Sequence, residues 1–375
     1  MPFAWLGGIM RAFVCAIIAA IGLAAQPAFA QADRTAATFW KTVQSTCDAT
    51  AAKPAGELGR RIAQTAIEEF TRFGGHQIDS NGRLFRFGLT EAQQEKDFAG
   101  DPQASLGRLG WWQVMKYWRA LYGNDTLDMI EALGYRDAST ATDEGQSAAL
   151  LRIDAGPLLR ALEAVSDPEA REVLREAALR AAVIDTPWSA AFVSFVIRQA
   201  GVATDAFHFS NAHRAYIYDA FATSAAELTN AAGNRIYRAC PVTTTRPRVG
   251  DLICHQREPA LADASEEVVR ERIRAELVGN PDARSVRRTH CDVIAHIDPR
   301  AHKMYIISGN VYHAVAARKL NLRRDLKLSA TQKGNCGGAA HWTLPQPTAD
   351  TAGAANRTSN CSLNDRKWFV LLQLR

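Results

Sequence analysis

The chain has 375 residues, seven cysteines and a formal net charge of +5, and 47% of its residues are hydrophobic. This length allows two modest domains or one elaborated domain. A charged fraction of 22%, with ordinary glycine and proline counts, excludes disordered, collagen-like and low-complexity chains. Because the positive charge is mild, we expect the arginine-rich residues 284–288 and 318–324 to form a solvated surface rather than a polyanion site.

The first 30 residues have the pattern of a bacterial-type secretory signal peptide. Arg11 precedes an apolar run over residues 12–25, and a small-x-small cleavage pattern ends at Ala30. The apolar run is too short for a comfortable transmembrane span. We therefore expect cleavage after about Ala30 and a periplasmic or secreted protein with no stable membrane span. Nucleic acid is a poor partner for such a protein, and the sequence does not indicate an oligomeric state.

Removing the signal peptide leaves an even set of six cysteines in an oxidising compartment, so disulfides are expected. The pair that we expect first is Cys336 with Cys361, because both lie in a tail with little apolar content. No two cysteines have the CxxC spacing of a structural zinc site. The six are Cys47, Cys240, Cys254, Cys291, Cys336 and Cys361.

Helical periodicity dominates residues 31–181. Apolar side chains recur there at intervals near 3.6 residues, and glycines or prolines stand near the expected helix ends. The predicted helices are residues 57–73, 111–122, 149–165 and 168–182, with a short strand over residues 83–87.

The pattern changes after residue 182. Thr186 and Pro187 are suited to the start of a buried helix over residues 188–200, and Gly201 is suited to its end. An amphipathic helix over residues 264–278 interrupts the strands that follow; it either covers the sheet or forms a lid beside a site. A helix followed by an antiparallel sheet indicates an α+β fold. The predicted strands are residues 251–254, 291–297, 303–308 and 368–374.

These features divide the chain into four segments. Residues 1–30 are the signal peptide and residues 31–181 form a helical N-terminal region. Residues 182–325 form the core, with a helical insertion over residues 256–289. Residues 326–375 form a C-terminal tail with the expected disulfide and the final strand.

The turn between the two central strands predicts which residues face each other. If Asp298 faces His302, the numbers of facing residues sum to about 600, so His290 faces Asn310. An asparagine in this position can orient an imidazole. Ser189 falls in the first turn of the buried helix, where free amides and the helix dipole favour negative charge. Taken singly, each residue also fits an ordinary capping, surface or turn role.

Several segments resemble NlpC-type and CHAP peptidoglycan hydrolases, in the same order and with similar spacing. Residues 188–193 resemble their nucleophile helix, which has the pattern Cys-small-small-Phe-Val. Residues 247–252 resemble their Pro-x-x-Gly-Asp-Leu segment, residues 290–294 their His-led strand, and residues 308–310 their third polar position. More narrowly, residues 188–192, 209–217 and 309–311 resemble a bacterial family known as domain of unknown function 2272, over residues 57–322.

This resemblance implies a papain-like core, in which the nucleophile helix packs on an antiparallel sheet, and amide hydrolysis in peptidoglycan or another cell-envelope polymer. Ser189 would attack the carbonyl, His290 would transfer the proton and Asn310 would orient His290. No cofactor is expected. The further candidates around this cleft are Trp188, Asp292, His213 and Ser308.

Ser189 stands where the resembled enzymes have cysteine, and a hydroxyl is far harder to ionise than a thiol. A serine hydrolase and a catalytically inactive, wall-binding protein of the same fold therefore both remain open. Cys254 and Cys291 lack activation by a helix end, so we expect them in a disulfide or in the core. A zinc-dependent hydrolase is a further alternative. Its candidate ligands are His208, His213, His290, Asp292, His296, His302 and His313.

Overall fold

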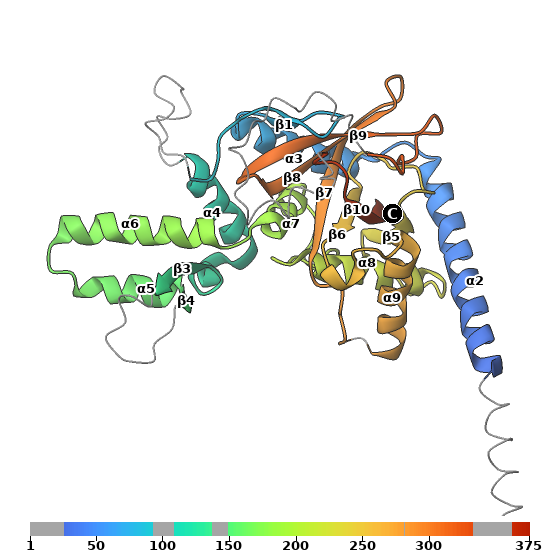
Figure 1. The fold of residues 1–375 in the computed structure, drawn as a ribbon, viewed down its shortest axis with the longest axis horizontal. Coiled ribbons are helices and arrows are strands. Elements are labelled where there is room, and N and C mark those ends of the chain that lie inside the picture. Colours follow the sequence, from blue (N-terminus) through green and yellow to red (C-terminus); the bar gives the residue numbers. More distant parts are fainter. Residues whose placement is uncertain (1–25, 93–108, 137–148, 281, 333–361) are drawn as a thin grey trace, which may run out of the picture.

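The computed structural model describes residues 26–92, 109–136, 149–280, 282–332 and 362–375. Within these residues the chain is an α+β protein in which helices surround an eight-stranded sheet (Figure 1). The helices are α2 (Gln26–Ala51), α3 (Glu57–Arg72), α4 (Leu109–Tyr122), α5 (Ala155–Ala161), α6 (Pro168–Asp185), α7 (Ser189–Gln199), α8 (His213–Glu227) and α9 (Glu266–Gly279). The strands are β1 (His76–Ile78), β2 (Leu84–Arg86), β3 (Glu131–Arg136), β4 (Ala149–Asp154), β5 (Tyr237–Pro241), β6 (Leu252–Gln256), β7 (Thr289–Asp298), β8 (Lys303–Val311), β9 (Ala314–Asn321) and β10 (Lys367–Leu374).

The large sheet has the strand order β2-β1-β9-β8-β7-β6-β10-β5. Its neighbouring strands are antiparallel, except that β1 runs parallel to β9. The last strand of the chain, β10, lies between β6 and β5. Strands β1 and β2 come from the N-terminal region, so the sheet unites segments from both ends of the described chain.

Both faces of this sheet are buried, so the central strands carry apolar residues at successive positions. Val293 of β7 belongs to a large core that also includes side chains of α3, α4, α7, α8 and α9. Its neighbour Ile294 points to the opposite face, into a smaller core that includes Val43 and Cys47 of α2. The helix predicted over residues 188–200 is therefore central, and its first turn lies against the sheet.

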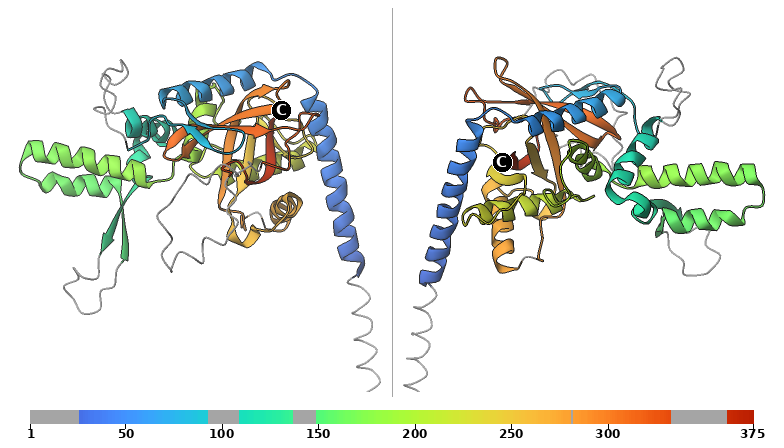
Figure 2. Two further views of the ribbon diagram at one scale, coloured as in Figure 1. Left: turned by 45° about the horizontal axis from the view of Figure 1, so that its top comes forward. Right: turned by 180° about the vertical axis from the view of Figure 1, so that it is seen from behind.

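An arm of β3, β4, α5 and α6 extends from the body (Figure 1), on the side away from α2 in both views of Figure 2. We expected a helix over residues 149–165, and this expectation was wrong for the first six residues. Ala149–Asp154 instead form β4, which pairs with β3 in a two-stranded sheet, and the helix α5 begins at Ala155. Pairing with the preceding strand β3 overrides the local helical pattern here.

Two disulfides connect distant parts of the described chain. Cys47 is bonded to Cys240, which joins α2 to β5, and Cys254 is bonded to Cys291 across β6 and β7. The expectation of disulfides is confirmed for these four residues, whereas Cys336 and Cys361 lie outside the described residues. Both bonds are compatible with an extracellular protein. The apolar part of the expected signal peptide, residues 12–25, also lies outside them.

None of the described helices is by itself long and apolar enough to cross a membrane. Helices α6 and α7 meet these criteria only when they are taken together, and they are bent by 93° relative to each other. Residues 189–199 of this pair are largely buried in the protein core.

The solvated surface expected over residues 318–324 is found at Arg323 and Arg324, which are exposed, but not at Arg318. Arg318 lies within β9 and is only 4% exposed. Its guanidinium donates a hydrogen bond to the Leu363 carbonyl at 2.7 Å and lies 3.7 Å from the Asp292 carboxylate. Asp292 of β7 and the Leu363 carbonyl in the turn before β10 thus compensate for the burial of this cation.

Candidate functional site

Ser189 is the first residue of α7, and the residue before it is fixed by packing. Trp188 is fully buried, and its ring lies 5.9 Å from the Phe73 ring and 5.7 Å from the Tyr117 ring. On the sheet side, Gly309 leaves room for the helix. A Cβ at Gly309 would lie 2.5 Å from Cζ3 of Trp188 and 2.6 Å from Cβ of Phe192. The glycine in the Ser-Gly-Asn segment therefore allows α7 to lie directly on β8.

The first turn of α7 has free hydrogen-bond donors. The first backbone bond of the helix runs from the Phe192 amide to the Trp188 carbonyl at 2.9 Å, and no side chain caps the helix. The amides of Ser189, Ala190 and Ala191 donate to no other residue in the described part of the chain. Ser189 itself is half-buried and thus reachable from solvent. Such a turn is suited to binding an oxygen acceptor.

The hydroxyl of Ser189 is hydrogen-bonded to His213, the first residue of α8. The distance from Ser189 Oγ to His213 Nε2 is 2.7 Å. The other ring nitrogen, Nδ1, contacts the Tyr216 hydroxyl and accepts a hydrogen bond from the Cys291 amide at 3.2 Å. We expected His213 as a residue of the cleft or a zinc ligand and not as the partner of Ser189, although Tyr216 three residues later on the same helix is the signal of an oriented ring.

We assign the ring proton of His213 from the contact with the Cys291 amide. A backbone amide can only donate, so Nδ1 is the acceptor and is unprotonated. Burial, together with the Arg257 guanidinium, lowers the pKa of His213 to about 3, so the ring is neutral near neutral pH. The single ring proton is therefore on Nε2, which donates to Ser189 Oγ.

The predicted base, His290, lies behind His213 and is not hydrogen-bonded to Ser189. Its ring centroid is 4.8 Å from that of His213 and 5.2 Å from that of His255. His290 is 4% exposed, and its Nε2 atom has no hydrogen-bond partner among the described residues. Burial and the neighbouring histidines hold the pKa of His290 well below its usual range.

Asp292 is the acidic neighbour of His290 and is fully buried. Its Oδ2 atom lies 3.9 Å from His290 Nε2, which is longer than a hydrogen bond. The other oxygen, Oδ1, accepts a hydrogen bond from the Ser308 hydroxyl at 2.6 Å. Burial raises the pKa of Asp292, although the Arg318 guanidinium opposes this shift. Asp292 thus lies beside His290 and is held by Ser308, and within the described residues neither is hydrogen-bonded to Ser189.

The predicted facing of His290 and Asn310 depends on the register of β7 and β8. The observed pairs, such as Val293 with Ile307, follow the predicted sum, but the ladder ends at this pair. Beyond it His290 pairs with His255 on β6. Asn310 has a left-handed backbone with φ of 54°, and no hydrogen bond between it and His290 is found in the described ranges. The Ser189, His290 and Asn310 triad therefore stays a prediction.

A buried carboxylate holds the other side of the α7 start. Glu91 is fully buried, and its Oε2 atom accepts a hydrogen bond from Trp188 Nε1. Its Oε1 atom lies 2.6 Å from Nδ1 of His313, whose side chain is 66% exposed. His313 also has a left-handed backbone, with φ of 59°. Sequence reasoning missed Glu91, because its partners are about 100 and 220 positions away along the chain.

The described residues contain no ligand set for the zinc alternative. There, no three histidine, cysteine, aspartate or glutamate side chains are arranged to hold a metal ion. His208 and His296 are exposed, and His302 lies in the turn between β7 and β8.

Comparisons with known proteins identify the family. No curated protein and no solved structure matches the chain. The likeness to NlpC-type and CHAP hydrolases therefore remains a proposal. A family model described as an uncharacterized protein conserved in bacteria, DUF2272, matches residues 107–374, which is more than half of the chain. The chain thus belongs to the DUF2272 family of bacterial proteins.

Proposed function

We propose that this chain is an exported cell-envelope protein that binds a carbonyl or carboxylate oxygen of a wall peptide at Ser189 and does not cleave the peptide. The observation that carries the proposal is the direction of the hydrogen bonds around His213. The Cys291 amide donates to Nδ1, and Nε2 consequently donates to Ser189. The hydroxyl proton of Ser189 is then left to donate to a ligand.

Hydrolysis requires the opposite arrangement. A general base presents an unprotonated nitrogen to the serine hydroxyl, and its second nitrogen donates to an acceptor that orients the ring. In His213 the second nitrogen, Nδ1, instead accepts a hydrogen bond from the Cys291 amide and contacts the Tyr216 hydroxyl. The lowered pKa of His213 also disfavours the imidazolium that forms during proton transfer. These features support binding over cleavage.

Two observations support a peptide oxygen as the ligand. The free amides of the first turn of α7 and the Ser189 hydroxyl are all donors, which suits a carbonyl or carboxylate oxygen. The choice of a wall peptide depends on the resemblance of residues 188–193 and 290–294 to peptidoglycan hydrolases. In this proposal the papain-like core is retained, and the position of the nucleophile serves as a binding position.

Serine-dependent amide hydrolysis is the second candidate, and the 2.7 Å contact between Ser189 Oγ and His213 Nε2 favours it. In this alternative His213, rather than His290, accepts the serine proton. Its own proton must first move to Nδ1 and be donated to Tyr216. The free amides of α7 then stabilise the oxyanion.

One experiment separates the two candidates. Mature protein is incubated with insoluble peptidoglycan and sedimented, and the supernatant is analysed for released muropeptides by mass spectrometry. We expect the protein to sediment with the polymer and to release no muropeptides. Ser189→Ala should weaken binding about three- to tenfold, because one hydrogen bond of roughly 0.5–1.5 kcal/mol is lost. The exposed Ser166 provides the control Ser166→Ala, which should bind like the wild type.

Other outcomes would contradict the binding proposal. Muropeptides released by the wild type, but not by Ser189→Ala or His213→Ala, would support the serine hydrolase. Release that a chelator abolishes would favour the zinc alternative. A wild-type protein that neither sediments with the polymer nor releases product would exclude both candidates for this substrate.

A further inference from the structure

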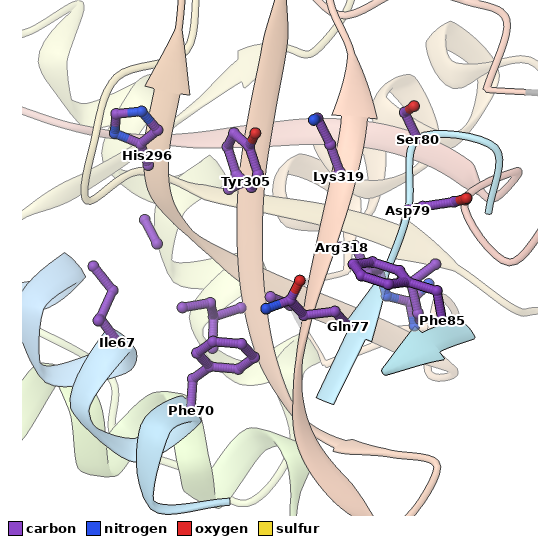
Figure 3. Close-up of a pocket in the computed structure, with 14 residues that line it drawn as sticks. Ile67, Phe70, Gln77, Asp79, Ser80, Phe85, His296, Tyr305, Arg318 and Lys319 are labelled. Carbon is purple, nitrogen blue, oxygen red and sulfur yellow. The ribbon is translucent and has the colours of Figure 1, made fainter. Parts of the chain in front are cut away.

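A cavity of about 420 Å³ opens between α3 and strands β7, β8 and β9, beside β1 and β2 (Figure 3). This volume falls in the range of small-molecule sites, roughly 300–1,000 Å³. Ser189, His213 and His290 are not among the residues that line it. The cavity is thus separate from the site described above.

Two cross-strand rows give the cavity a polar end and an apolar end. His296, Tyr305 and Lys319 are register neighbours on β7, β8 and β9, and Figure 3 shows them side by side. One step along the strands, Ile307 is paired with Ala317, and these residues form an apolar floor. Because side chains two positions apart share one face of a strand, both rows face the cavity.

Lys319 is the cation available to a ligand at the polar end. Its Nζ atom lies 5.2 Å from the centroid of the Tyr305 ring, and it forms no ion pair within the described ranges. Arg318 also lines the cavity, but its guanidinium donates to Leu363. Asp79 at the rim accepts hydrogen bonds from the amides of Asn81 and Arg83, both at 2.9 Å. This carboxylate is thus held by its own loop.

The opposite end offers apolar surface to a ligand. Figure 3 shows Ile67 and Phe70 of α3 at the end away from His296, Tyr305 and Lys319, with Phe85 of β2 at the side. Ile67 is 36% exposed and Phe85 is 60% exposed, so both leave apolar area in contact with water. A ligand body that covers them gains hydrophobic free energy. Gln77 and Arg318 are the polar side chains at this end, and the Arg318 guanidinium already donates to Leu363, which gives a sugar few hydrogen-bond partners.

We propose that this cavity binds a small amphipathic carboxylate. Its acyl or aromatic body lies on Phe70, Ile307 and Ala317, and its carboxylate pairs with Lys319. The proposal does not depend on the function of Ser189, because the two sites share no lining residue.

Calorimetry with three probes tests this proposal. Decanoate and 2-naphthoate supply the acyl and aromatic carboxylates, and decanol supplies the same acyl chain without charge. We expect saturable binding of at least one carboxylate by the full mature chain. Lys319→Gln should weaken carboxylate binding about three- to tenfold and leave decanol binding unchanged. Lys53→Gln, which removes an exposed lysine between α2 and α3, should change neither.

A second variant tests the apolar floor. Ala317→Trp should fill the cavity and weaken all binding at least tenfold, and thermal melting checks that this variant is folded. If it is not folded, Ile67→Glu replaces it, because this exposed position tolerates charge and the new carboxylate repels the ligand. The proposal is overturned if neither carboxylate binds the wild type, or if the folded variant, Ala317→Trp or its replacement Ile67→Glu, binds like the wild type. It is also overturned if Lys319→Gln weakens decanol and carboxylate binding equally.

Discussion

Helix α7 begins between two histidines with opposite surroundings. On one side, His213 is 5% exposed and its Nε2 atom is hydrogen-bonded to Ser189. On the other side, the His313 side chain is 66% exposed and is paired with buried Glu91, which accepts a hydrogen bond from Trp188. The adjacent residues Ser189 and Trp188 are thus held by different titratable groups, Ser189 by His213 and Trp188 by Glu91.

The different surroundings of His213 and Glu91 determine where pH acts on this site. Burial lowers the pKa of His213 to about 3, so the hydrogen bond at Ser189 stays unchanged across the neutral range. Burial raises the pKa of Glu91, against the opposing effect of its hydrogen bonds from His313 and Trp188. A change in pH therefore reaches the start of α7 through Trp188 and not through Ser189.

The largest effect should come from Gly309→Ala, because Gly309 packs closely against Trp188 and Phe192 at the start of α7. The new Cβ would overlap the Trp188 ring and Phe192, so α7 must move away from β8. We expect the free energy of unfolding to fall by about 1–3 kcal/mol, as for other overpacked cores. Denaturant unfolding measures this loss. Gly279→Ala is the control, because a Cβ at Gly279 meets no atom within 4 Å. Equal stability of the two variants would contradict the packing argument.

The next largest effect should come from Glu91→Ala, which disturbs only the Trp188 side. The indole Nε1 atom would lose its acceptor inside the core. An unsatisfied buried donor costs about 1–3 kcal/mol, and we expect a loss near 2 kcal/mol in denaturant unfolding. The Ser189 side should be unaffected, so binding of Ser189 ligands should change less than stability does. A loss below about 0.5 kcal/mol would mean that this carboxylate does not hold Trp188.

The pH dependence of Glu91 gives a smaller effect with a definite sign. Its pKa is raised in the folded chain above the ordinary value of 4.5. The corresponding stabilisation is fully present below about pH 4.5 and is lost as the pH rises through the raised value. The stability of the wild type relative to Glu91→Gln should therefore decrease from pH 4.5 toward neutrality.

Denaturant unfolding at several pH values measures this difference, with Glu267→Gln as the control at an exposed position of α9. The control should show no such decrease. A difference that grows with pH would mean that the hydrogen bonds from His313 and Trp188 outweigh burial.

Much of the fold could be predicted from sequence, because helix periodicity and strand composition are local. The buried helix over residues 188–200 is observed as Ser189–Gln199, and the inserted helix over residues 264–278 as Glu266–Gly279. Strand β9 was not predicted, because Arg318 and Lys319 within it indicated a solvated surface. The buried position of Arg318 depends on Asp292 of β7 and on Leu363 in the turn before β10, which are partners far from it along the chain.

The candidate site was predicted less completely. Helix-start chemistry identified Ser189, and turn geometry placed His290 on the correct strand. The partner of Ser189 is instead His213, 24 residues away at the start of another helix. The loop between α7 and α8 determines this contact, and loop conformation has no local sequence pattern of the kind that marks a helix. The facing of Asn310 and His290 stays a prediction, because the ladder of β7 and β8 ends before these residues and Asn310 adopts a left-handed φ.

The smallest effect should come from Tyr216→Phe, which tests the His213 side alone. The hydroxyl contacts Nδ1 of a fully buried ring, so its removal should cost about 1 kcal/mol in the free energy of unfolding. The Cys291 amide still donates to Nδ1 in this variant. We therefore expect the proton to remain on Nε2 of His213 and the pKa of this ring to remain low. Long-range proton–nitrogen NMR spectra of the histidine rings distinguish the two tautomers directly.

The tautomer in this variant decides between the two functions proposed for Ser189. If the proton stays on Nε2, the Cys291 amide alone maintains the donor arrangement, and the serine has no base whether or not Tyr216 is present. If the wild type instead carries the proton on Nδ1 and Tyr216→Phe moves it to Nε2, Tyr216 accepts from His213. Nε2 of the wild type would then be free to accept the serine proton. That result would favour hydrolysis over binding as the function of Ser189.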